Sequence, residues 1–161
     1  MKKVEEEFIG LIRRHEGIIY KICRFYCRDT DDIQDLYQEI VMNLWKSYPG
    51  FRNDSKISTW LYRISLNCAI TYNRNKKKII PVVEISPNLS ESLSQIENNA
   101  LIERLYDIVN HLNKIERSII FLYLEGKSHR EISDLIGCSV TNVGTKIQRI
   151  KIKMADINQK Y

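Results

Sequence analysis

Hydrophobic residues recur every three or four positions along most of the chain, the spacing that aligns side chains on one face of an α-helix. In the first half, this pattern predicts one helix from Glu5 to about Cys27 and a second from Asp29 to Tyr48. The Pro49–Gly50 pair should stop the second helix. Ser58 is then expected to cap a third helix that runs toward residues 76–78.

Residues 79–98 break this pattern, because Pro81, Pro87 and several serines interrupt both the helical and the strand period. We expect a flexible, mildly acidic linker there. The sequence therefore predicts an all-α protein of two small helical domains. These are an N-terminal helical bundle over residues 1–78 and a C-terminal helix-turn-helix domain over residues 99–161.

The C-terminal domain is expected to contain four helices. The first runs from Ala100 to Leu112, the second from Lys114 to about Leu124, and the last two lie between Ser128 and Lys153. The apolar side of the first of these helices is expected to contain Leu101, Leu105, Ile108, Val109 and Leu112.

The last two helices have the layout of a DNA-binding helix-turn-helix. Ser128 followed by Glu131 forms a capping box, in which hydroxyl and carboxylate satisfy backbone donors at a helix start. Gly137 can adopt the left-handed conformation that ends this helix, and Ser139 can cap the next one. The pattern points to recognition of DNA rather than to catalysis.

Helical geometry divides the last helix into two faces. Its core face is expected to contain Val143, Ile147, Ile150 and Met154. The opposite face can meet base edges in a DNA groove, and the basic residues beside it can meet phosphates. The residues expected to contact DNA are Ser139, Thr141, Asn142, Thr145, Lys146, Gln148, Arg149 and Lys153. Gly144 inside the helix and Ile152 on the exposed face fit this arrangement less well.

Charge is distributed unevenly along the chain, whose formal net charge is +5. Basic residues cluster near residues 63–78 and again in the last thirty or so positions, and acidic residues concentrate at 29–39. This segregation indicates two faces for nucleic acid and one separate acidic face for a protein partner.

Several functional classes find no support in the sequence. The four cysteines lack the paired spacing, with nearby histidines, of a zinc site, so no metal and no other cofactor is expected. The three histidines have no partner pattern for a nucleophile, and we expect neither catalysis nor a small-molecule substrate. With no signal peptide and no long apolar stretch, the protein is expected to be cytoplasmic and not inserted in a membrane.

Three segments, taken in order, resemble the extracytoplasmic-function (ECF) sigma factors, the small two-domain branch of the sigma-70 family. DIQDLYQEIVMNLW, starting at Asp32, resembles the helix that binds core RNA polymerase. FRNDSKISTWLYRISLNCAITYNRNKKK, starting at Phe51, resembles the loop and helix that open and read the minus-10 element. EISDLIGCSVTNVGTKIQRIKIKM, starting at Glu131, resembles the helix-turn-helix that reads the minus-35 element.

For the polymerase-binding helix, the resemblance implies docking on a coiled coil of the largest polymerase subunit. Asp32, Asp35 and Glu39 lie at i, i+3 and i+7, on the side opposite the apolar stripe. An acidic helix face is suited to a basic partner. Enrichment of acids at a helix start explains Asp31 and Asp32 well, but it explains Glu39 less well, because that residue lies beyond the first turn. The candidate polymerase-binding residues are Asp32, Asp35, Gln38 and Glu39.

For the minus-10 element, the resemblance implies that the loop before the third helix captures an unstacked base. The candidate DNA-binding residues of this segment are Phe51, Arg52, Asn53, Asp54, Ser55, Arg63, Asn67, Tyr72, Arg74, Lys76, Lys77 and Lys78. Trp60 is expected in the core rather than on DNA, because it extends an apolar stripe with Leu61 and Ile64. Leu66, where relatives often carry a basic residue, and Thr71, where many have aspartate, depart from the family pattern. Ser133 departs in the second domain, where alanine is commoner.

The resemblance implies a sigma factor that binds core polymerase, directs it to a promoter class and helps melt the DNA. An anti-sigma factor is a further partner implied by the family. One rival is a stand-alone helix-turn-helix repressor or activator, which predicts a palindromic operator and tight DNA binding without polymerase. Another is a protein–protein adaptor with a vestigial DNA motif, which predicts no salt-dependent DNA affinity.

Overall fold

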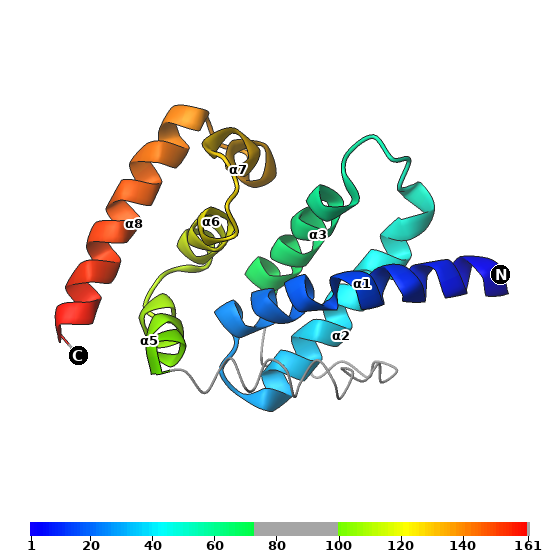
Figure 1. Ribbon diagram of the computed structural model, residues 1–161, viewed down its shortest axis with the longest axis horizontal. Helices are drawn as coiled ribbons and strands as arrows, with labels where there is room; N and C mark the ends of the chain where they lie inside the picture. The colour runs from blue at the N-terminus through cyan, green and yellow to red at the C-terminus, as the bar shows by residue number, and fades with distance from the viewer. Residues whose placement is uncertain (73–99, 161) are drawn as a thin grey trace. The chain divides into compact units, whose positions relative to one another are not determined.

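The computed structural model describes residues 1–72 and 100–160 of the chain, and every regular element in these two ranges is helical (Figure 1). This confirms the all-α fold. The chain divides into two compact units, Met1–Leu93 and Ser94–Tyr161. The expected linker over residues 79–98 lies outside the described residues.

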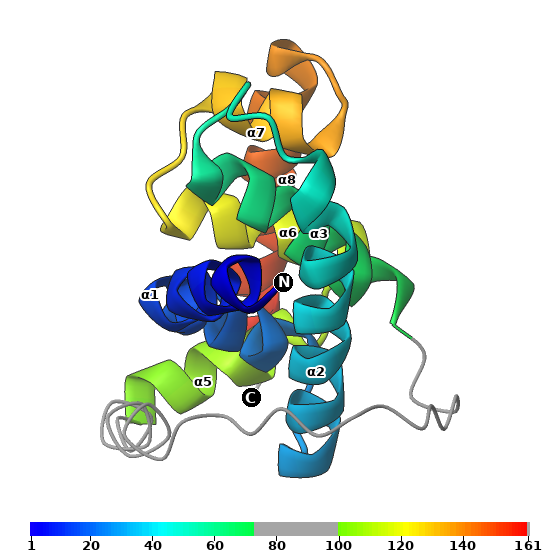
Figure 2. The same ribbon diagram turned by 90° about the vertical axis from the view of Figure 1, so that its right-hand side faces the viewer.

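Within residues 1–72, the first unit forms a bundle of three α-helices. Its elements are α1 (Lys2–Tyr26), α2 (Thr30–Ser47), a short 3₁₀ helix η1 (Tyr48–Gly50) and α3 (Ile57–Thr71). Each of the three α-helices packs against the other two (Figure 2). The core forms where apolar stripes meet: Leu36, Ile40 and Leu44 of α2 are fully buried, as are Ile19 of α1 and Leu61 of α3.

The start of α3 differs from the sequence expectation. Lys56 is the N-cap and the helix begins at Ile57, so Ser58 is already the second helical residue and makes no capping bond. The prediction that Ser58 caps this helix is therefore wrong. At the other end α3 stops at Thr71, and Tyr72 is extended, so the helix does not continue toward residues 76–78, which are not described.

The buried face of α3 is also rotated relative to the predicted stripe. Tyr62, Ser65 and Leu66 are buried, whereas Trp60 and Ile64 are only half-buried at its margin. Leu66 therefore contributes to the core of the first unit. The sequence missed this face because serine and tyrosine are weak markers of burial.

The second unit contains α5 (Ala100–Val109), α6 (Lys114–Leu124), α7 (His129–Ile136) and α8 (Val140–Lys160). Helix α8 packs against all of the other three. Its core residues Val143, Ile147 and Ile150 are buried together with Ile132 of α7 and Leu122 of α6.

The first helix of this unit is shorter than predicted, because it ends at Val109 rather than Leu112. The guanidinium of Arg117 in α6 donates to the carbonyl oxygens of Leu112 and Asn110, at 3.0 and 2.8 Å, and so satisfies acceptors just beyond the end of α5. Leu112 is buried as expected, but Leu101 is 78% exposed. The placement of Leu101 on the packed side of α5 is therefore wrong.

Candidate nucleic-acid and partner interfaces

The first helix of the helix-turn-helix begins as the sequence predicts. The backbone N–H of Glu131 donates to Ser128 Oγ at 3.1 Å, and the N–H of Ser128 donates to Glu131 Oε2 at 3.0 Å. Both halves of the capping box are thus present, and α7 starts at His129.

The turn between α7 and α8 is fixed by three local features. Gly137 has a φ of +84°, the left-handed conformation that glycine adopts at low cost. The hydroxyl of Ser133 donates to the carbonyl oxygen of Cys138 across the turn. Ser139 Oγ accepts from the N–H of Asn142 at 3.2 Å at the start of α8. Ser133 therefore does more than pack, because its hydroxyl ties α7 to the turn in a way that alanine could not.

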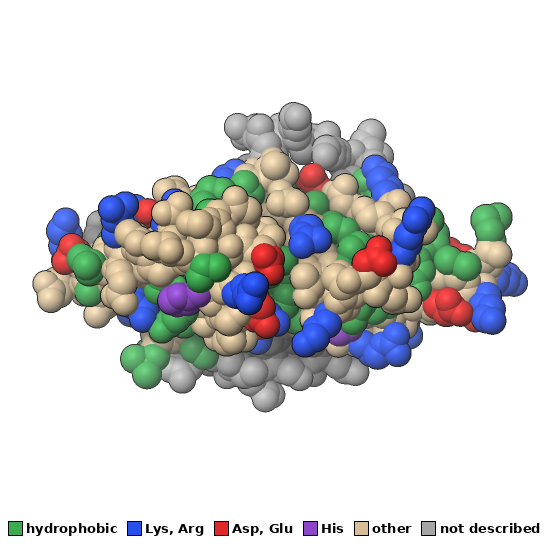
Figure 3. Space-filling view, turned by 90° about the horizontal axis from the view of Figure 1, so that it is seen from above, with side chains coloured by type: hydrophobic (Ala, Val, Ile, Leu, Met, Phe, Trp, Pro, Cys, Tyr) green, Lys and Arg blue, Asp and Glu red, His purple; other side chains and the backbone are tan. Residues whose placement is uncertain are grey.

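Helix α8 has a buried and an exposed face as its sequence predicts, except that Met154, expected on the core face, is only half-buried. Val143, Ile147 and Ile150 are buried. The candidate DNA-contacting residues Ser139, Thr141, Asn142, Thr145, Lys146, Gln148, Arg149 and Lys153 are all exposed. Lys146, Arg149 and Lys153 thus lie among exposed neutral polar side chains of α8. In the space-filling view, Lys and Arg side chains are likewise scattered rather than gathered in one block (Figure 3). Such a surface combines groups for phosphates with groups for base edges.

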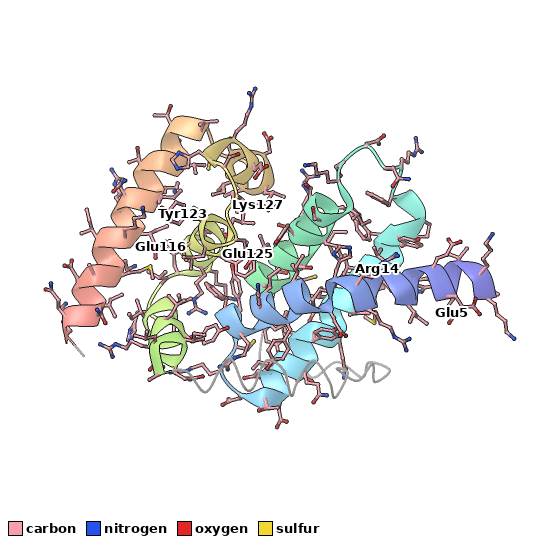
Figure 4. All side chains as sticks on the ribbon, viewed as in Figure 1. Glu5, Arg14, Glu116, Tyr123, Glu125 and Lys127 are labelled. Carbon is pink, nitrogen blue, oxygen red and sulfur yellow. The ribbon has the colours of Figure 1, made fainter. Side chains whose placement is uncertain are left out.

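The C-terminal half of α8 is tied to α6 through its lysines (Figure 4). Lys153 Nζ lies 2.9 Å from Glu116 Oε2, and Lys151 Nζ lies 2.8 Å from the hydroxyl of Tyr123. Burial alone would raise the pKa of Glu116, but the bonds from Lys153 and from the Asn113 N–H, with the lysine charge, lower it. Lys153 therefore already has an intramolecular anionic partner, which the sequence did not reveal.

Glu116 also completes a second capping box. Its Oε2 accepts from the N–H of Asn113 at 3.0 Å, and Asn113 Oδ1 accepts from the N–H of Glu116 at 2.8 Å. The sequence contains the pattern of this capping box, an Asn followed three residues later by a Glu, although the box was not among the sequence-based predictions.

In the first unit, the acidic side of α2 lies opposite its buried stripe. Asp35 is exposed, whereas Asp32, Gln38 and Glu39 are half-buried. The four candidate residues thus share one side of α2, and Asp35 is the most accessible carboxylate among them.

Tyr72 connects the end of α3 to this acidic side. Burial, followed by the neighbouring Cys27 thiol and the carboxylates of Asp32, Asp35 and Glu39, raises the pKa of the Tyr72 phenol. The phenol therefore lies within electrostatic reach of the α2 carboxylates. The family resemblance had grouped Tyr72 with the minus-10 residues.

The loop before α3 divides into a packed aromatic base and an exposed tip. The ring centroids of Phe51 and Trp60 are 5.0 Å apart, so Phe51 is already in contact with another ring. Arg52, Asn53 and Asp54 are exposed, and Asn53 has a φ of +58°. Asparagine tolerates this left-handed conformation better than most residues, which fits it to the tip of a tight loop.

Trp60 is part of a chain of aromatic side chains that the sequence did not reveal. The ring centroid of Tyr48 lies 6.3 Å from that of Trp60 and 5.3 Å from that of Phe8. The Phe8 centroid is in turn 4.9 Å from that of Trp45. Trp60 is thus half-buried against Phe51 and Tyr48. These contacts fix the base of the loop to the bundle.

The remaining minus-10 candidates fall into two groups. Arg63 and Asn67 are exposed one helical turn apart on α3, and Ser55 in the loop is half-buried. Arg74, Lys76, Lys77 and Lys78 lie outside the described residues.

The described residues provide no metal centre. In ranges 1–72 and 100–160, no group of three or more His, Cys, Asp or Glu side chains could hold a metal ion. None of the four cysteines forms a disulfide bond, and Cys23, Cys27 and Cys68 are buried. None of the helices in these ranges is both long and apolar enough to cross a membrane.

Two family models match the chain in the order that its domains require. The model for Sigma-70 region 2 matches residues 11–79, and the model for Sigma-70, region 4 matches residues 102–154. The first match covers α2 and α3, which carry the candidate polymerase-binding and minus-10 residues, and the second covers the part of α8 that carries the minus-35 candidates.

Curated relatives match along almost the whole chain. The ECF RNA polymerase sigma-E factor of Escherichia coli (strain K12) is 29% identical over an alignment 161 positions long, gaps included, which covers 91% of this chain and 84% of the relative. The sigma-E factor of Haemophilus influenzae is 27% identical, with 91% and 85% covered. The sigma factor SigM of Mycobacterium tuberculosis (strain H37Rv) is 21% identical, with 92% and 75% covered.

Solved structures share the fold. CnrH, in complex with the cytosolic domain of CnrY, matches with a TM-score of 0.69 and 21% identity over 97% of this chain and 90% of that chain. RpoE of Bartonella quintana, in complex with the anti-sigma factor NepR, matches with a TM-score of 0.65 and 18% identity over 99% and 98%. The two ordered family matches and the curated relatives establish that the chain belongs to the sigma-70 family, as an ECF RNA polymerase sigma factor.

Proposed function

We propose that this sigma factor binds core RNA polymerase through the acidic side of α2 and contacts promoter DNA through α3, its preceding loop and α8. The observation that carries the proposal is the ordered match to regions 2 and 4, each falling on a unit with a suitable exposed face. The polymerase supplies the phosphoryl-transfer chemistry, and this chain supplies recognition.

For polymerase binding, Asp35 is the central residue because its carboxylate is exposed in the middle of the acidic side of α2. Glu39 lies one turn further along the same side. Carboxylates on a rigid helix complement a basic partner surface and increase the rate of encounter. The hydroxyl of Tyr72 adds a polar group to the same region.

For the minus-10 element, the exposed tip formed by Arg52, Asn53 and Asp54 is the base-capturing part of the loop. Phe51 supports the tip from below through its contact with Trp60. Arg63 and Asn67 continue the same surface along α3. Opening the duplex costs a few kcal/mol per unstacked base, which a preformed pocket can offset.

For the minus-35 element, α8 enters the major groove with Thr141, Thr145 and Gln148 toward the bases. Lys146 and Arg149 flank this surface and contact phosphates. Lys153 reaches a phosphate only by giving up its contact with Glu116, so we assign it the smallest contribution among the basic residues of α8.

An anti-sigma factor is the proposed regulatory partner. Both structural neighbours were solved with a second protein bound, CnrY in one case and the anti-sigma factor NepR in the other. Such a partner would hold this chain inactive in the cytoplasm by covering surfaces that polymerase and DNA require.

The decisive experiment mixes the purified protein with bacterial core RNA polymerase and genomic promoter fragments and sequences the transcripts that start. We expect discrete starts that share an upstream motif and are absent with core alone. Tight binding of a palindromic duplex by the protein alone, without specific starts, would instead support the stand-alone repressor. Core from the source organism is the required control.

The polymerase contact is tested by a double charge reversal, Asp35→Arg with Glu39→Arg. We expect this variant to fold normally but to lose co-purification with core polymerase. The matched control is Glu6→Arg with Glu7→Arg, which makes the same charge change on the exposed start of α1. If the α2 variant still binds core as the wild type does, the assignment of this face is wrong.

A further inference from the structure

One position on the DNA-facing side of α8 carries no side chain. At 100° per residue, Gly144 falls between Ile147 of the buried stripe and Gln148 of the exposed face. It is half-buried, at the margin where α8 packs against α7. Glycine in a helix interior lowers helix stability by roughly 1 kcal/mol relative to alanine, so Gly144 destabilises α8.

A side chain from α7 lies beside this gap. A Cβ placed on Gly144 would lie 3.6 Å from Nδ1 and 3.7 Å from Cε1 of His129, which is ordinary van der Waals contact. His129 is the first residue of α7, and its position is fixed by the capping box of Ser128 and Glu131. The imidazole therefore covers the recognition helix at position 144 while its residue remains exposed.

We propose that His129 is a further promoter-contacting residue, whose imidazole donates a hydrogen bond to a backbone phosphate beside the minus-35 element. The proposal rests on the proposed contact of α8 with that element. The imidazole of His129 in α7 thus provides a polar group beside position 144 of α8, where glycine has no side chain.

A phosphate is the partner that the position of His129 favours. The ring lies at the edge of the recognition face, toward α7, and not at its centre where Thr141 and Thr145 lie. In a helix-turn-helix the first helix crosses the DNA backbone while the second enters the groove. The next residue, Arg130, is also exposed and adds positive charge to the same edge.

The test separates a DNA contact from simple packing. His129→Phe keeps a ring against Gly144 but removes the donor, and thermal unfolding confirms that the fold is kept. Affinity is measured with holoenzyme on a duplex that spans the minus-35 element of a promoter found from its transcript starts, and on the same duplex with that element scrambled. We expect an about tenfold loss on both duplexes, as for a hydrogen bond to a charged group.

Gly144→Ala is the matched control, because the added methyl group makes only ordinary contact with the imidazole. This variant should bind DNA like the wild type. If it loses as much affinity as His129→Phe, the bare backbone makes the contact and the proposal is wrong. It is also wrong if His129→Phe binds like the wild type, or if its loss is confined to one base-pair position.

Variants of α8 separate failure of this inference from failure of the proposed function. Arg149→Ala should weaken binding to all duplexes, and Gln148→Ala should change the preference at one position. If both behave so while His129→Phe has no effect, only the histidine assignment fails. If none of the three alters binding, the assignment of α8 to the minus-35 element fails, and the present proposal fails with it.

Discussion

The two units obtain their helices in different ways. In the first unit, none of the helices α1, α2 and α3 has a side-chain capping bond at its start. These helices are instead held by their packing, and α2, for example, completely buries Leu36, Ile40 and Leu44. In the second unit, α6 and α7 are short, and each begins with a complete capping box. Short helices are marginal in isolation, so local caps contribute more to them than to long helices packed along their whole length.

This difference suits the proposed tasks of the two units. A bundle held by its core can expose an acidic side on α2 and a polar loop tip without losing its shape. A helix-turn-helix depends on the angle between two short helices, and here the caps, Gly137 and the Ser133 hydroxyl set that angle locally.

The largest effect is expected from truncating a core residue in one unit at a time. Leu36→Ala should destabilise the first unit by about 2–5 kcal/mol, because it leaves a cavity in a fully buried site. Both tryptophans of the chain, Trp45 and Trp60, lie in the first unit, so their fluorescence reports its unfolding alone. Denaturant unfolding followed by fluorescence and by far-UV circular dichroism measures the change.

The matched variant in the second unit is Leu122→Ala, also at a fully buried site. It should shift the circular dichroism transition while leaving the fluorescence transition in place. If Leu122→Ala moves the fluorescence transition as well, the two units unfold as one cooperative body, and the contrast drawn between them fails.

An intermediate effect is expected from two serines near helix starts. Ser128→Ala removes the hydroxyl that accepts from the Glu131 N–H and should cost about 1 kcal/mol in the second unit. Ser58→Ala should change the stability of the first unit by no more than a few tenths of a kcal/mol, because Ser58 makes no capping bond. Equal losses of unfolding free energy in the two variants would show that the capping bonds of the second unit do not stabilise it more than uncapped helix starts stabilise the first.

These serines also show how far the sequence could be interpreted alone. Helix positions and the faces of α8 follow from periodicity, because burial of one face is what creates the period. The capping role of Ser58 was wrong because the helix begins at Ile57, two residues earlier than a cap at Ser58 requires. Such a shift is set by how α3 packs, which periodicity does not specify.

The candidate site residues divide in the same way, into features that periodicity predicts and features that depend on packing between elements. The exposed polar residues of α8 and Asp35 of α2 were predictable, because each helix has a clear buried stripe opposite them. The contacts of Lys153 with Glu116 and of Phe51 with Trp60 were not predictable, since they join separate elements. Leu101 was misplaced because its periodicity matches the rest of α5, yet the first turn of that helix leaves it exposed.

The smallest effect concerns acid sensitivity, which the Lys153–Glu116 contact should give to the second unit. The pKa of Glu116 is lowered in the folded state, so its contribution to stability is full above the unfolded pKa and is lost as the pH falls through the folded pKa. The loss should therefore appear below about pH 4.5. Because the pair is partly exposed, the whole contribution should not exceed about 1 kcal/mol.

The measurement compares the pH dependence of unfolding of the wild type and Glu116→Gln by circular dichroism between about pH 3 and 6. In this range the wild type should lose more stability with acid than the glutamine variant, because the amide has no proton to take up. Lys153→Met should lie between them, since Glu116 keeps its bond from the Asn113 N–H when the lysine is absent. Identical pH dependence in all three proteins would mean that the pair does not stabilise the second unit, which would leave Lys153 free to contribute to DNA binding as fully as Lys146 and Arg149.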